Sequence, residues 1–578
     1  MRILFLTHSF NSLAQRLYAE LSRRGHQLSV ELDINDATTE SAVRLFRPQL
    51  IVAPFLKRPI PESVWRRHMC LIVHPGIRGD RGPSALDHAI LDGERTWGVT
   101  VLQAEAEMDA GPVWAWREFP MRATRKSSLY RREVTEAAVA AVIEAVERHA
   151  SGACRPEHVA LSDPSVRGRW RDPVRQAERR IHWTADDTAT VLRKIRSGDG
   201  DPGVVDELAG HCVRLFDAQA EERLSGPAGA LIARRHGAVC RATVDGAVWL
   251  GHLRKPKDGA CGFKLPATRV LGDAAAALPA SHIDIAADVT WATRRDIRYE
   301  ERGPVGFLHF DFYNGAMGAG ECERLLAAWR YACTRPTRVI VLAGGGDFWS
   351  NGLNLNCIEA APSPADESWR NINAMDDLAE AIITNTSHVS VAALGANAGA
   401  GGVFLALAAD RVLARDGVIL NPHYKNMGNL YGSEYWTYLL PRRVGTEGVA
   451  AVMGHRLPLD ARSAAAMGVV DVLGVRDPAG FQAEVEILAA ALAADADFPA
   501  LVRDKQRRRA ADEAAKPLAA YRAEELARMR LNFYGFDPSY HVARYRFVHR
   551  TPHAWTPLYL AAHRRLGWQV PDETPDAA

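Results

Sequence analysis

The sequence predicts a multidomain α/β protein, and three features indicate this class. The chain has 578 residues, which is too long for one hydrophobic core when domains usually hold about 100–200 residues. Short apolar runs of strand length alternate with amphipathic helical stretches in both halves. An Ala-rich stretch with Gly and Pro separates two halves of different character. We therefore expect segments at 1–165, 166–270, 271–290 (a linker) and 291–578.

The composition is that of a globular protein without a strong charge bias. Hydrophobic residues make up 47% and charged residues 24%, and the net charge is only +2, so neither nucleic acid nor membrane is expected as a partner. The eight cysteines are scattered, without C-x-x-C or zinc spacing, which favours free thiols in a reducing compartment and predicts no metal site. The apolar run in MRILFLTHSF is too short for a signal peptide, and no run of about 18 apolar residues occurs. We expect a soluble cytoplasmic protein.

The first elements form a strand–loop–helix unit. Arg2 to Thr7 is a short apolar strand, and an amphipathic helix follows from Leu13 to Arg24. Ser9 and Asn11 lie in the loop between them, where a helix N-terminus offers free N–H groups to a ligand; the same residues also fit a simple helix cap. Two further strands and a closing helix are expected at Leu28–Leu32, Leu50–Pro54 and Glu133–Ala150.

The most informative stretch of the chain runs from Val73 to Pro112. An apolar strand ends at His74, and a Gly/Arg loop and a short helix follow; a second strand then leads to Asp109. Ligands bind at the carboxyl ends of strands in open α/β sheets, so His74 and Asp109 are expected to form an acid/base pair in one crevice. The alternative is that both residues only shape turns.

Residues 166–270 read as a small β-rich unit. Thr184 is a plausible cap for a helix, and short strands are expected near Ala230, Val239 and Val248. The segment from 166 to 269 holds 19 Lys and Arg against 13 Asp and Glu. A basic balance of this size suits either tRNA or an ordinary solvated face.

The second half of the chain contains two glycine-rich turns. The strand Thr337–Gly344 leads into the first, and the strand Val389–Leu394 leads into the second, GANAGAGG, where an apolar helix begins at once. Backbone N–H groups at such a helix start can stabilise a thioester oxyanion, although glycines also allow tight packing. Three further elements are expected: a strand at Val305–Phe310, a helix at Gly320–Thr334 and a charged helical extension at Asp504–Met529.

The pattern of apolar strand, His-Pro-Gly, Gly/Arg loop, helix, Gly-Val-Thr-Val and Asp-Ala-Gly resembles the N10-formyltetrahydrofolate-dependent formyltransferases. The later pattern IHW…ATVLRKIRS…PG resembles the C-terminal domain of methionyl-tRNA formyltransferases. The resemblance implies a Rossmann-like domain, a small OB-like domain and N10-formyltetrahydrofolate as one-carbon donor. It implies catalytic roles for His74 and Asp109. It places folate contacts at Ser9, Asn11, Ile72 and Gly111.

One position departs from that family. Where its members carry an Asn that holds the oxyanion of the formyl intermediate, this chain has Ile72. The missing amide argues against ordinary formylation of an amine. A thiol is a better nucleophile near neutral pH and lessens the need for that amide.

The two glycine loops, together with LLPRRVG at 439–445, look like the crotonase (enoyl-CoA hydratase) superfamily. The resemblance implies a crotonase-fold α/β domain that acts on a coenzyme A thioester. It places the oxyanion hole on the N–H groups of Leu353 and Gly401. The family's first hydratase carboxylate falls on Phe404, so simple hydration of a double bond is not expected.

The second hydratase carboxylate falls on Tyr424, or on His423 if the register slips by one residue. Tyr424 and Glu434 are the expected proton-transfer pair, because burial can tune a tyrosine and a carboxyl group for this task. The alternative is that Tyr424 packs in the core and Glu434 only favours a helix N-terminus.

The fused order of the two halves is similar to a family of maturation proteins of nickel–iron hydrogenases, on the segments HPGIRGDRGPS and NPHYKN…GSEYW. That resemblance implies transfer of a formyl group to coenzyme A and decarbonylation of formyl-CoA to carbon monoxide for the hydrogenase iron, with transient contact to the maturation machinery. Tethering two such sites raises the effective concentration of the intermediate. Two alternatives stay open, namely an amine formyltransferase joined to a separate acyl-CoA enzyme, and a non-catalytic scaffold.

Overall fold

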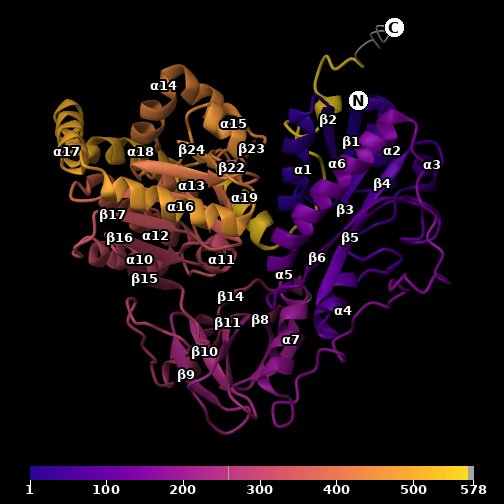
Figure 1. The fold of residues 1–578 in the computed structure, drawn as a ribbon, viewed down its shortest axis with the longest axis horizontal. Helices are drawn as coiled ribbons and strands as arrows, with labels where there is room; N and C mark the ends of the chain where they lie inside the picture. Colours follow the sequence, from indigo (N-terminus) through magenta and orange to yellow (C-terminus); the bar gives the residue numbers. More distant parts are fainter. Residues whose placement is uncertain (258–259, 571–578) are drawn as a thin grey trace. The chain divides into compact units, whose positions relative to one another are not determined.

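The computed structural model describes residues 1–257 and 260–570. The chain divides into two compact units (Figure 1). The first unit comprises Met1–Ile181, Ala189–Val205 and the described residues from Pro552 onwards. The second comprises His182–Thr188 and Asp206–Thr551.

The first unit is built on a six-stranded sheet with the order β2-β1-β3-β4-β5-β6. The first four strands are parallel, whereas β5 is antiparallel to β4, and β6 is antiparallel to β5. The strands are β1 (Arg2–Thr7), β2 (Gln27–Leu32), β3 (Leu50–Phe55), β4 (Cys70–His74), β5 (Thr96–Gln103) and β6 (Val113–Pro120). Their apolar runs are buried almost throughout, as expected for strands covered on both faces.

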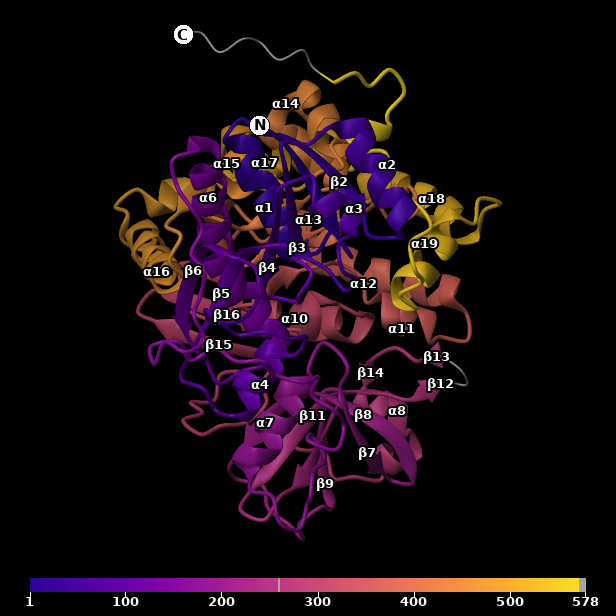
Figure 2. The ribbon, with the colours of Figure 1, turned by 90° about the vertical axis from the view of Figure 1, so that its right-hand side faces the viewer.

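Helices cover both faces of this sheet (Figures 1 and 2). Helices α1 and α6 pack together, and α6 also packs on β5 and β6. On the opposite face, Leu4 and Leu6 of β1 join a core with Val43 and Phe46 of α2. The helices are α1 (Ser12–Arg23), α2 (Asp36–Phe46), α3 (Glu62–Trp65), α4 (Ala85–Leu91), α5 (Lys126–Leu129), α6 (Thr135–Ser151) and α7 (Thr188–Gly198), with a π-helical turn η1 (Tyr130–Val134).

The expected helix start at Thr184 is wrong. Residues 183–185 form a turn, and α7 begins at Thr188. The carboxylate of Asp245 accepts hydrogen bonds from the Thr188 N–H and hydroxyl, each at 2.8 Å. A partner from a distant strand connection therefore decides where this helix begins.

The last described segment returns to the first unit and covers the edge strand β2. The Val30 N–H donates to the Leu560 carbonyl at 3.0 Å, and the Leu32 N–H donates to the Thr556 hydroxyl at 2.9 Å. Edge strands expose unpaired N–H groups, and this segment, yellow beside β2 in Figure 1, satisfies two of them. A 3₁₀ turn, η3 (Ala562–Arg564), lies at its centre.

The second unit begins with a small, mainly antiparallel sheet in the order β7-β8-β11-β10-β9. Trp249 of β11 is fully buried in its core with Ala233 and Cys240. The elements are β7 (Val204–Leu208), β8 (His211–Glu221), β9 (Leu231–Arg235), β10 (Ala238–Ala242), β11 (Ala247–Arg254), β12 (Pro256–Lys257), β13 (Ala260–Cys261), β14 (Leu265–Pro266), α8 (Ala267–Leu271) and α9 (Asp273–Ala276). The expected small β-rich domain is confirmed.

Two further sheets form the rest of the second unit. The six-stranded sheet has the order β15-β16-β17-β19-β21-β24, and a four-stranded sheet has the order β18-β20-β22-β23. The strands are β15 (Ile297–Arg302), β16 (Val305–Phe310), β17 (Val339–Ala343), β18 (Phe348–Ser350), β19 (Val389–Leu394), β20 (Asn397–Gly399), β21 (Arg411–Arg415), β22 (Ile419–Asn421), β23 (Leu459–Asp460) and β24 (Val472–Gly474).

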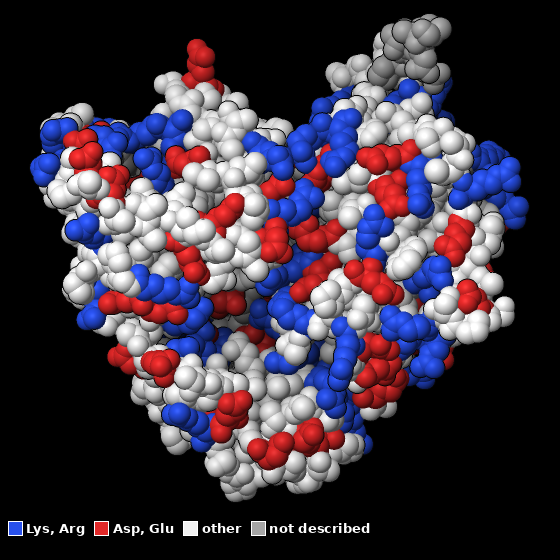
Figure 3. All heavy atoms as spheres, viewed as in Figure 1, with Lys and Arg blue, Asp and Glu red and all other residues white. Residues whose placement is uncertain are grey.

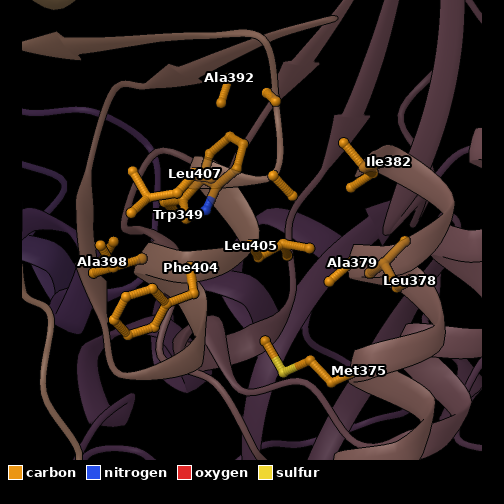
Figure 4. Packing of buried hydrophobic residues seen from close by; sticks show 14 of the residues in the cluster. Trp349, Met375, Leu378, Ala379, Ile382, Ala392, Ala398, Phe404, Leu405 and Leu407 are labelled. Carbon is orange, nitrogen blue, oxygen red and sulfur yellow. The ribbon is translucent and has the colours of Figure 1, made fainter. Parts of the chain in front are cut away.

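The helices of this part pack around two hydrophobic cores, a large one and a smaller one that includes Phe481 and Val485. Leu405 of α13 points toward Leu378 and Ala379 of α12, whereas the Phe404 ring points away from α12 (Figure 4). The helices are α10 (Ala319–Ala332), α11 (Leu355–Glu359), α12 (Pro364–Thr384), α13 (Gly401–Leu407), α14 (Trp436–Gly454), α15 (Ala461–Ala466), α16 (Pro478–Ala494), α17 (Phe498–Ala515), α18 (Leu518–Tyr534) and α19 (Ser539–Val548), with a 3₁₀ turn η2 (Tyr313–Gly315).

The expected continuous helical segment from Asp504 to Met529 is interrupted. Helix α17 ends at Ala515, and α18 begins after Pro517. Proline cannot donate the backbone hydrogen bond that a helix interior needs, so a new helix starts there.

The surface carries both charge signs. On the face shown in Figure 3, Lys and Arg side chains alternate with Asp and Glu. Within the described part of the chain, no helix is long and apolar enough to cross a membrane. The seven cysteines whose side chains are described are free thiols; the side chain of Cys261 lies outside the described residues.

Candidate active sites

The first site forms where β4 ends at His74. The loop that follows is fixed from the neighbouring strand, because the Trp97 indole donates to the Pro75 carbonyl and the Thr100 hydroxyl donates to the Gly76 carbonyl. A Cβ at Gly76 would lie 2.2 Å from His74 Nε2. Only glycine at this position leaves room for the imidazole.

The imidazole of His74 lies between two carboxylates. Asp109 Oδ2 is 3.4 Å from Nδ1, and Asp80 Oδ2 is 3.1 Å from Nε2. His74 is 4% exposed, and burial disfavours its charged form. The hydrogen bond with Asp80 and the charges of Asp109 and Asp80 outweigh this effect and raise the pKa of His74. The arrangement stabilises an imidazolium.

Asp109 reaches His74 by a route that the sequence analysis did not foresee. Because β5 is antiparallel to β4, Thr100 pairs with His74, whereas Gln103 at the end of β5 pairs with Leu71. His74 and Asp109 do meet, as expected, but their two strands do not end at the same edge of the sheet. The loop after β5 turns back and brings Asp109 to His74. Asp109 has a φ of +53°, and its Oδ2 accepts the Gly82 N–H at 3.2 Å.

Gly111 has a packing role in this loop. A Cβ at Gly111 would lie 1.9 Å from the Gln103 carbonyl oxygen. The structure thus explains the glycine by the close return of the chain to β5, and a contact of Gly111 with folate stays a prediction.

Asp80 is the residue of this site that the sequence analysis did not assign. Its side chain is fully buried, and Arg171 Nε lies 3.3 Å from Oδ1. The Arg171 guanidinium lies over the Trp97 ring at 5.4 Å. An acidic residue six positions after a strand-ending histidine, inside a Gly/Arg loop, was the available signal.

Three predicted folate-binding residues lie on the strands and loop of the same sheet. Asn11 caps α1, since its Oδ1 accepts the Ala14 N–H at 3.0 Å, and its amide lies 3.3 Å from the Tyr130 hydroxyl. The Ser9 carbonyl accepts from the Thr7 hydroxyl at 2.9 Å. Ile72 lies two residues before His74 in β4, so both side chains point to one face of the sheet.

The second site is centred on the start of α13. Helix α13 begins at Gly401, so the N–H of this residue has no acceptor within the helix. A Cβ at Gly352 would lie 3.4 Å from the Gly401 nitrogen. Leu353, which follows Gly352, forms an isolated parallel β-bridge with Met317. The segment with Leu353 therefore runs beside the start of α13.

Tyr424 and Glu434 form a buried pair at this position. The Tyr424 hydroxyl is 2.5 Å from Glu434 Oε2, and a Cβ at Gly401 would lie 2.1 Å from Glu434 Oε1. Burial, the charge of Asp376 and that of Glu525 raise the pKa of Glu434 to about 8. Burial also raises the pKa of Tyr424 well above its ordinary value. The structure thus brings Tyr424, Glu434 and Gly401 together.

An aromatic ring packs against this pair, and a buried histidine precedes Tyr424 in the sequence. The Tyr424 ring stacks on Phe404, with ring centres 5.5 Å apart and planes 15° apart. Of the two registers left open, Tyr424 is the one whose side chain contacts Glu434. His423 is also buried; burial and the nearby Arg456, His455 and Lys425 lower its pKa to about 4.

Two more carboxyl groups approach the turn that carries Glu434, and the sequence analysis assigned neither. Asp376 of α12 accepts the Glu434 N–H at 2.8 Å, and Glu525 of α18 accepts the Tyr435 N–H at 3.0 Å. Asp376 falls in helical spacing with buried Ile372 and Ala379. Glu525 does so with Met529. An acidic residue on an otherwise apolar helix face is the sequence feature that could have indicated these two residues.

Comparison with known proteins gives the class of each half. Residues 1–146 match the formyl transferase family model, and residues 173–264 match the formyl transferase C-terminal domain. Residues 315–522 match the enoyl-CoA hydratase/isomerase model. The fold and the two sites therefore define a fusion of a formyltransferase with a crotonase-fold domain.

Relatives that share this whole arrangement identify the family. Hydrogenase maturation factor HoxX of Bradyrhizobium diazoefficiens is 56% identical over 98% of this chain and 97% of its own length. A crystal structure of HypX from Aquifex aeolicus in complex with tetrahydrofolic acid is 49% identical, with a TM-score of 0.95 over 99% of this chain and 100% of that one. The chain belongs to the HoxX family of hydrogenase maturation factors.

Proposed function

We propose that the first unit transfers a formyl group from N10-formyltetrahydrofolate to coenzyme A, and that the second unit splits formyl-CoA into carbon monoxide and coenzyme A. The carbon monoxide would become a ligand of the iron in a nickel–iron hydrogenase. The observation that carries the proposal is the buried Tyr424–Glu434 pair beside Gly401. This pair would supply a proton-transfer group beside the helix start that is proposed to bind the oxyanion, where a hydratase would need two carboxylates. Tetrahydrofolate in the Aquifex aeolicus HypX structure supports the folate half.

The first reaction exchanges one acyl bond for another. The thiol sulfur attacks the formyl carbon, the bond to N10 breaks, and the thiol proton ends on N10. His74, held between Asp80 and Asp109, is suited to give a proton to the leaving nitrogen, because the two carboxylates favour its imidazolium form. Ile72 on the same face offers no amide to a tetrahedral oxyanion, which favours a thiol over an amine as acceptor.

The second reaction needs neither an oxidant nor a reductant. The formyl C–H and C–S bonds break, a S–H bond forms, and carbon monoxide leaves. Glu434 and Tyr424 are proposed to carry the proton from carbon to sulfur, while the N–H groups of Leu353 and Gly401 hold the formyl oxygen. A carboxyl group with a pKa of about 8 is half-protonated near pH 8 and still about one-tenth ionised at pH 7, so it can both accept and return a proton.

The test is to supply the purified chain with N10-formyltetrahydrofolate, with and without coenzyme A, and to follow carbon monoxide by its binding to a haem protein. We expect release that requires the folate and increases with coenzyme A. His74→Ala should stop consumption of the folate. Folate consumption without any carbon monoxide would overturn the second half of the proposal.

The two halves can be tested separately with formyl-CoA as the substrate. Tyr424→Phe and Glu434→Gln should each lower carbon monoxide release by roughly 100-fold or more, the usual contribution of general acid–base catalysis, while both variants still consume the folate in the presence of coenzyme A. Normal release by both variants would remove the pair from the mechanism.

A further inference from the structure

The turn Ser433–Tyr435 is held by carboxyl groups from two helices that lie far from it in the sequence. Asp376 comes from α12 and Glu525 from α18. Both carboxyl groups and Ser433 are fully buried, and Glu434 is 1% exposed. These contacts bear on the proposed proton transfer by Glu434, and the inference drawn from them rests on that proposal.

The backbone of this turn is unusual. Glu434 and Tyr435 are consecutive non-glycine residues with φ of +59°, a region that side chains disfavour, and such residues persist only when their surroundings hold them. The Glu434 N–H donates to Asp376 Oδ1 at 2.8 Å, and the Tyr435 N–H donates to Glu525 Oε2 at 3.0 Å. The two carboxyl groups thus bind the two amides whose direction depends on the left-handed backbone.

The hydroxyl of Ser433 lies between the same two carboxyl groups. Its oxygen is 2.8 Å from Asp376 Oδ2 and 3.2 Å from Glu525 Oε2. A serine hydroxyl has one hydrogen and can donate to only one of them. If both contacts are hydrogen bonds, one carboxyl group must carry a proton and donate to the Ser433 oxygen.

The number of donors favours Asp376 as the protonated group. Glu525 accepts from the Tyr435 N–H, from the N–H and hydroxyl of Thr437, and from Ser433; these donors stabilise a carboxylate. The Asp376 Oδ2 lies within hydrogen-bond distance of Ser433. Burial raises the pKa of both groups, that of Asp376 to about 7 and that of Glu525 to about 8, so the choice between them rests on the donors.

Other charged or titratable groups also face this cluster. The Arg522 guanidinium of α18 is 3.9 Å from Asp376 and opposes its protonation. Asp377, adjacent on α12, favours it. Glu380 accepts from the Tyr435 hydroxyl. Further groups that interact with the cluster are Cys322 of α10, Tyr424, Tyr431 and Lys516.

We propose that Asp376 and Glu525 are positioning residues for Glu434. They hold the Ser433–Tyr435 turn in its left-handed conformation and share one proton with the Ser433 hydroxyl. The Glu434 carboxyl group is thereby kept against Gly401 and Tyr424, and only one of the two supporting carboxyl groups carries a negative charge beside it. The helical extension of the chain, through Glu525, becomes part of the second site.

The experiment compares Asp376→Asn, Asp376→Ala and Glu525→Gln in the full chain with formyl-CoA as the substrate. An asparagine can accept the Glu434 N–H and donate to Ser433, as a protonated aspartic acid does, so D376N should release carbon monoxide at least about five times faster than D376A. E525Q should lose roughly 10-fold or more, because both of its carboxyl oxygens accept N–H groups and an amide nitrogen must then face a donor. Asp377→Asn and Glu524→Gln are matched controls on the same helices, with side chains 52% and 64% exposed.

A second readout does not depend on carbon monoxide release. Infrared difference spectra of the substrate-free chain across a pH titration would follow the Glu434 carboxyl band, which E434Q identifies by its loss. E525Q should move the midpoint of that band to lower pH, because it removes the one negative charge that the proposal leaves beside Glu434. D376N should leave the midpoint nearly unchanged, because it replaces one neutral group with another. The E524Q control should move the midpoint much less than E525Q does. The D376N spectra also cover the case in which D376A or E525Q fails to fold.

The outcomes separate this inference from the proposed function. If E434Q is inactive while D376A and E525Q release carbon monoxide at the wild-type rate, the positioning role is overturned and the proposed function stands. If E434Q is fully active, the proposed function fails, and the infrared midpoint alone decides the positioning role. An unchanged midpoint in E525Q, or a clearly lower midpoint in D376N, would overturn it.

Discussion

Asp80 as well as Asp109 favours the protonated form of His74. Both carboxylates lie within 3.4 Å of the ring nitrogens, and their combined effect raises the pKa of a histidine whose burial alone would lower it. Asp109 could be anticipated from the Asp-Ala-Gly motif. Asp80 lies six positions after His74 in the Gly/Arg loop, but nothing local shows that this loop folds its side chain against the imidazole.

Removing the charge of Asp80 should change the pH dependence of formyl transfer. A group with a raised pKa keeps its proton at low pH and loses it as the pH rises through that pKa, so transfer that uses the imidazolium should decline on the alkaline side. Asp80→Asn removes both effects of Asp80 on His74 and should move this decline to lower pH, with a loss of roughly 10-fold at neutral pH. The measurement is the pH profile of folate consumption in the presence of coenzyme A.

Asp92→Asn is the matched control for this variant. Asp92 contacts the same Arg171 at 2.7 Å, and its side chain is 45% exposed. D92N therefore removes the same charge as D80N without removing a contact of the imidazole. A D80N profile that superimposes on those of the wild type and D92N would show that Asp80 does not control His74.

The loop between β22 and α14 positions Tyr424 by leaving space for its ring. Gly432 has a φ of +91°, and a Cβ there would lie 2.0 Å from Tyr424 Cε2. Gly432→Ala should displace the ring from Glu434 and strain the backbone, with a cost of about 1–3 kcal/mol. We expect a lower melting temperature and at least a roughly 10-fold loss of carbon monoxide release from formyl-CoA.

Two controls accompany the Gly432 variant. Gly454→Ala introduces the same methyl group at a position with nothing within 4 Å and should leave both quantities unchanged. Folate consumption in the first unit should be normal in both variants. Wild-type carbon monoxide release by G432A would contradict the proposed role of this loop.

The last segment of the chain stabilises the first unit rather than only ending the second. Glu31 of the edge strand β2 is fully buried and lies 2.8 Å from His563 and 2.7 Å from Arg564. Trp568 stacks on Phe46 of α2, with ring centres 5.5 Å apart. The described residues from 552 to 570 are therefore part of the first unit, although the sequence analysis grouped them with residues 291–551.

Disrupting the contact of His563 with Glu31 should increase the local opening of β2 selectively. His563→Ala leaves the buried Glu31 with one partner fewer, and breaking a buried pair costs about 3–5 kcal/mol. We expect faster hydrogen exchange at the Val30 and Leu32 amides, measured by mass spectrometry, with unchanged exchange in β16. Leu566→Ala, at a fully exposed side chain, is the control. Equal exchange in the two variants would show that the His563–Glu31 contact does not stabilise β2.

The class of each half could be predicted from the sequence because its signals are local. Apolar strands, the His-Pro-Gly stop after β4 and the glycine turns before α13 depend on neighbouring residues, and their elements begin and end close to the expected positions. The candidates His74, Tyr424 and Glu434 were found in the same way, from motifs a few residues long.

The supporting residues depend on contacts across the fold. Asp376 meets Glu434 across 58 sequence positions, and Glu525 meets Tyr435 across 90; Asp109 reaches His74 only because a loop turns back from an antiparallel strand. Periodicity can mark a carboxyl group on an apolar helix face, but it cannot say which backbone amide will face it. Burial and long-range pairing are properties of the packed chain, so only the tertiary structure shows how Glu434 and His74 are held.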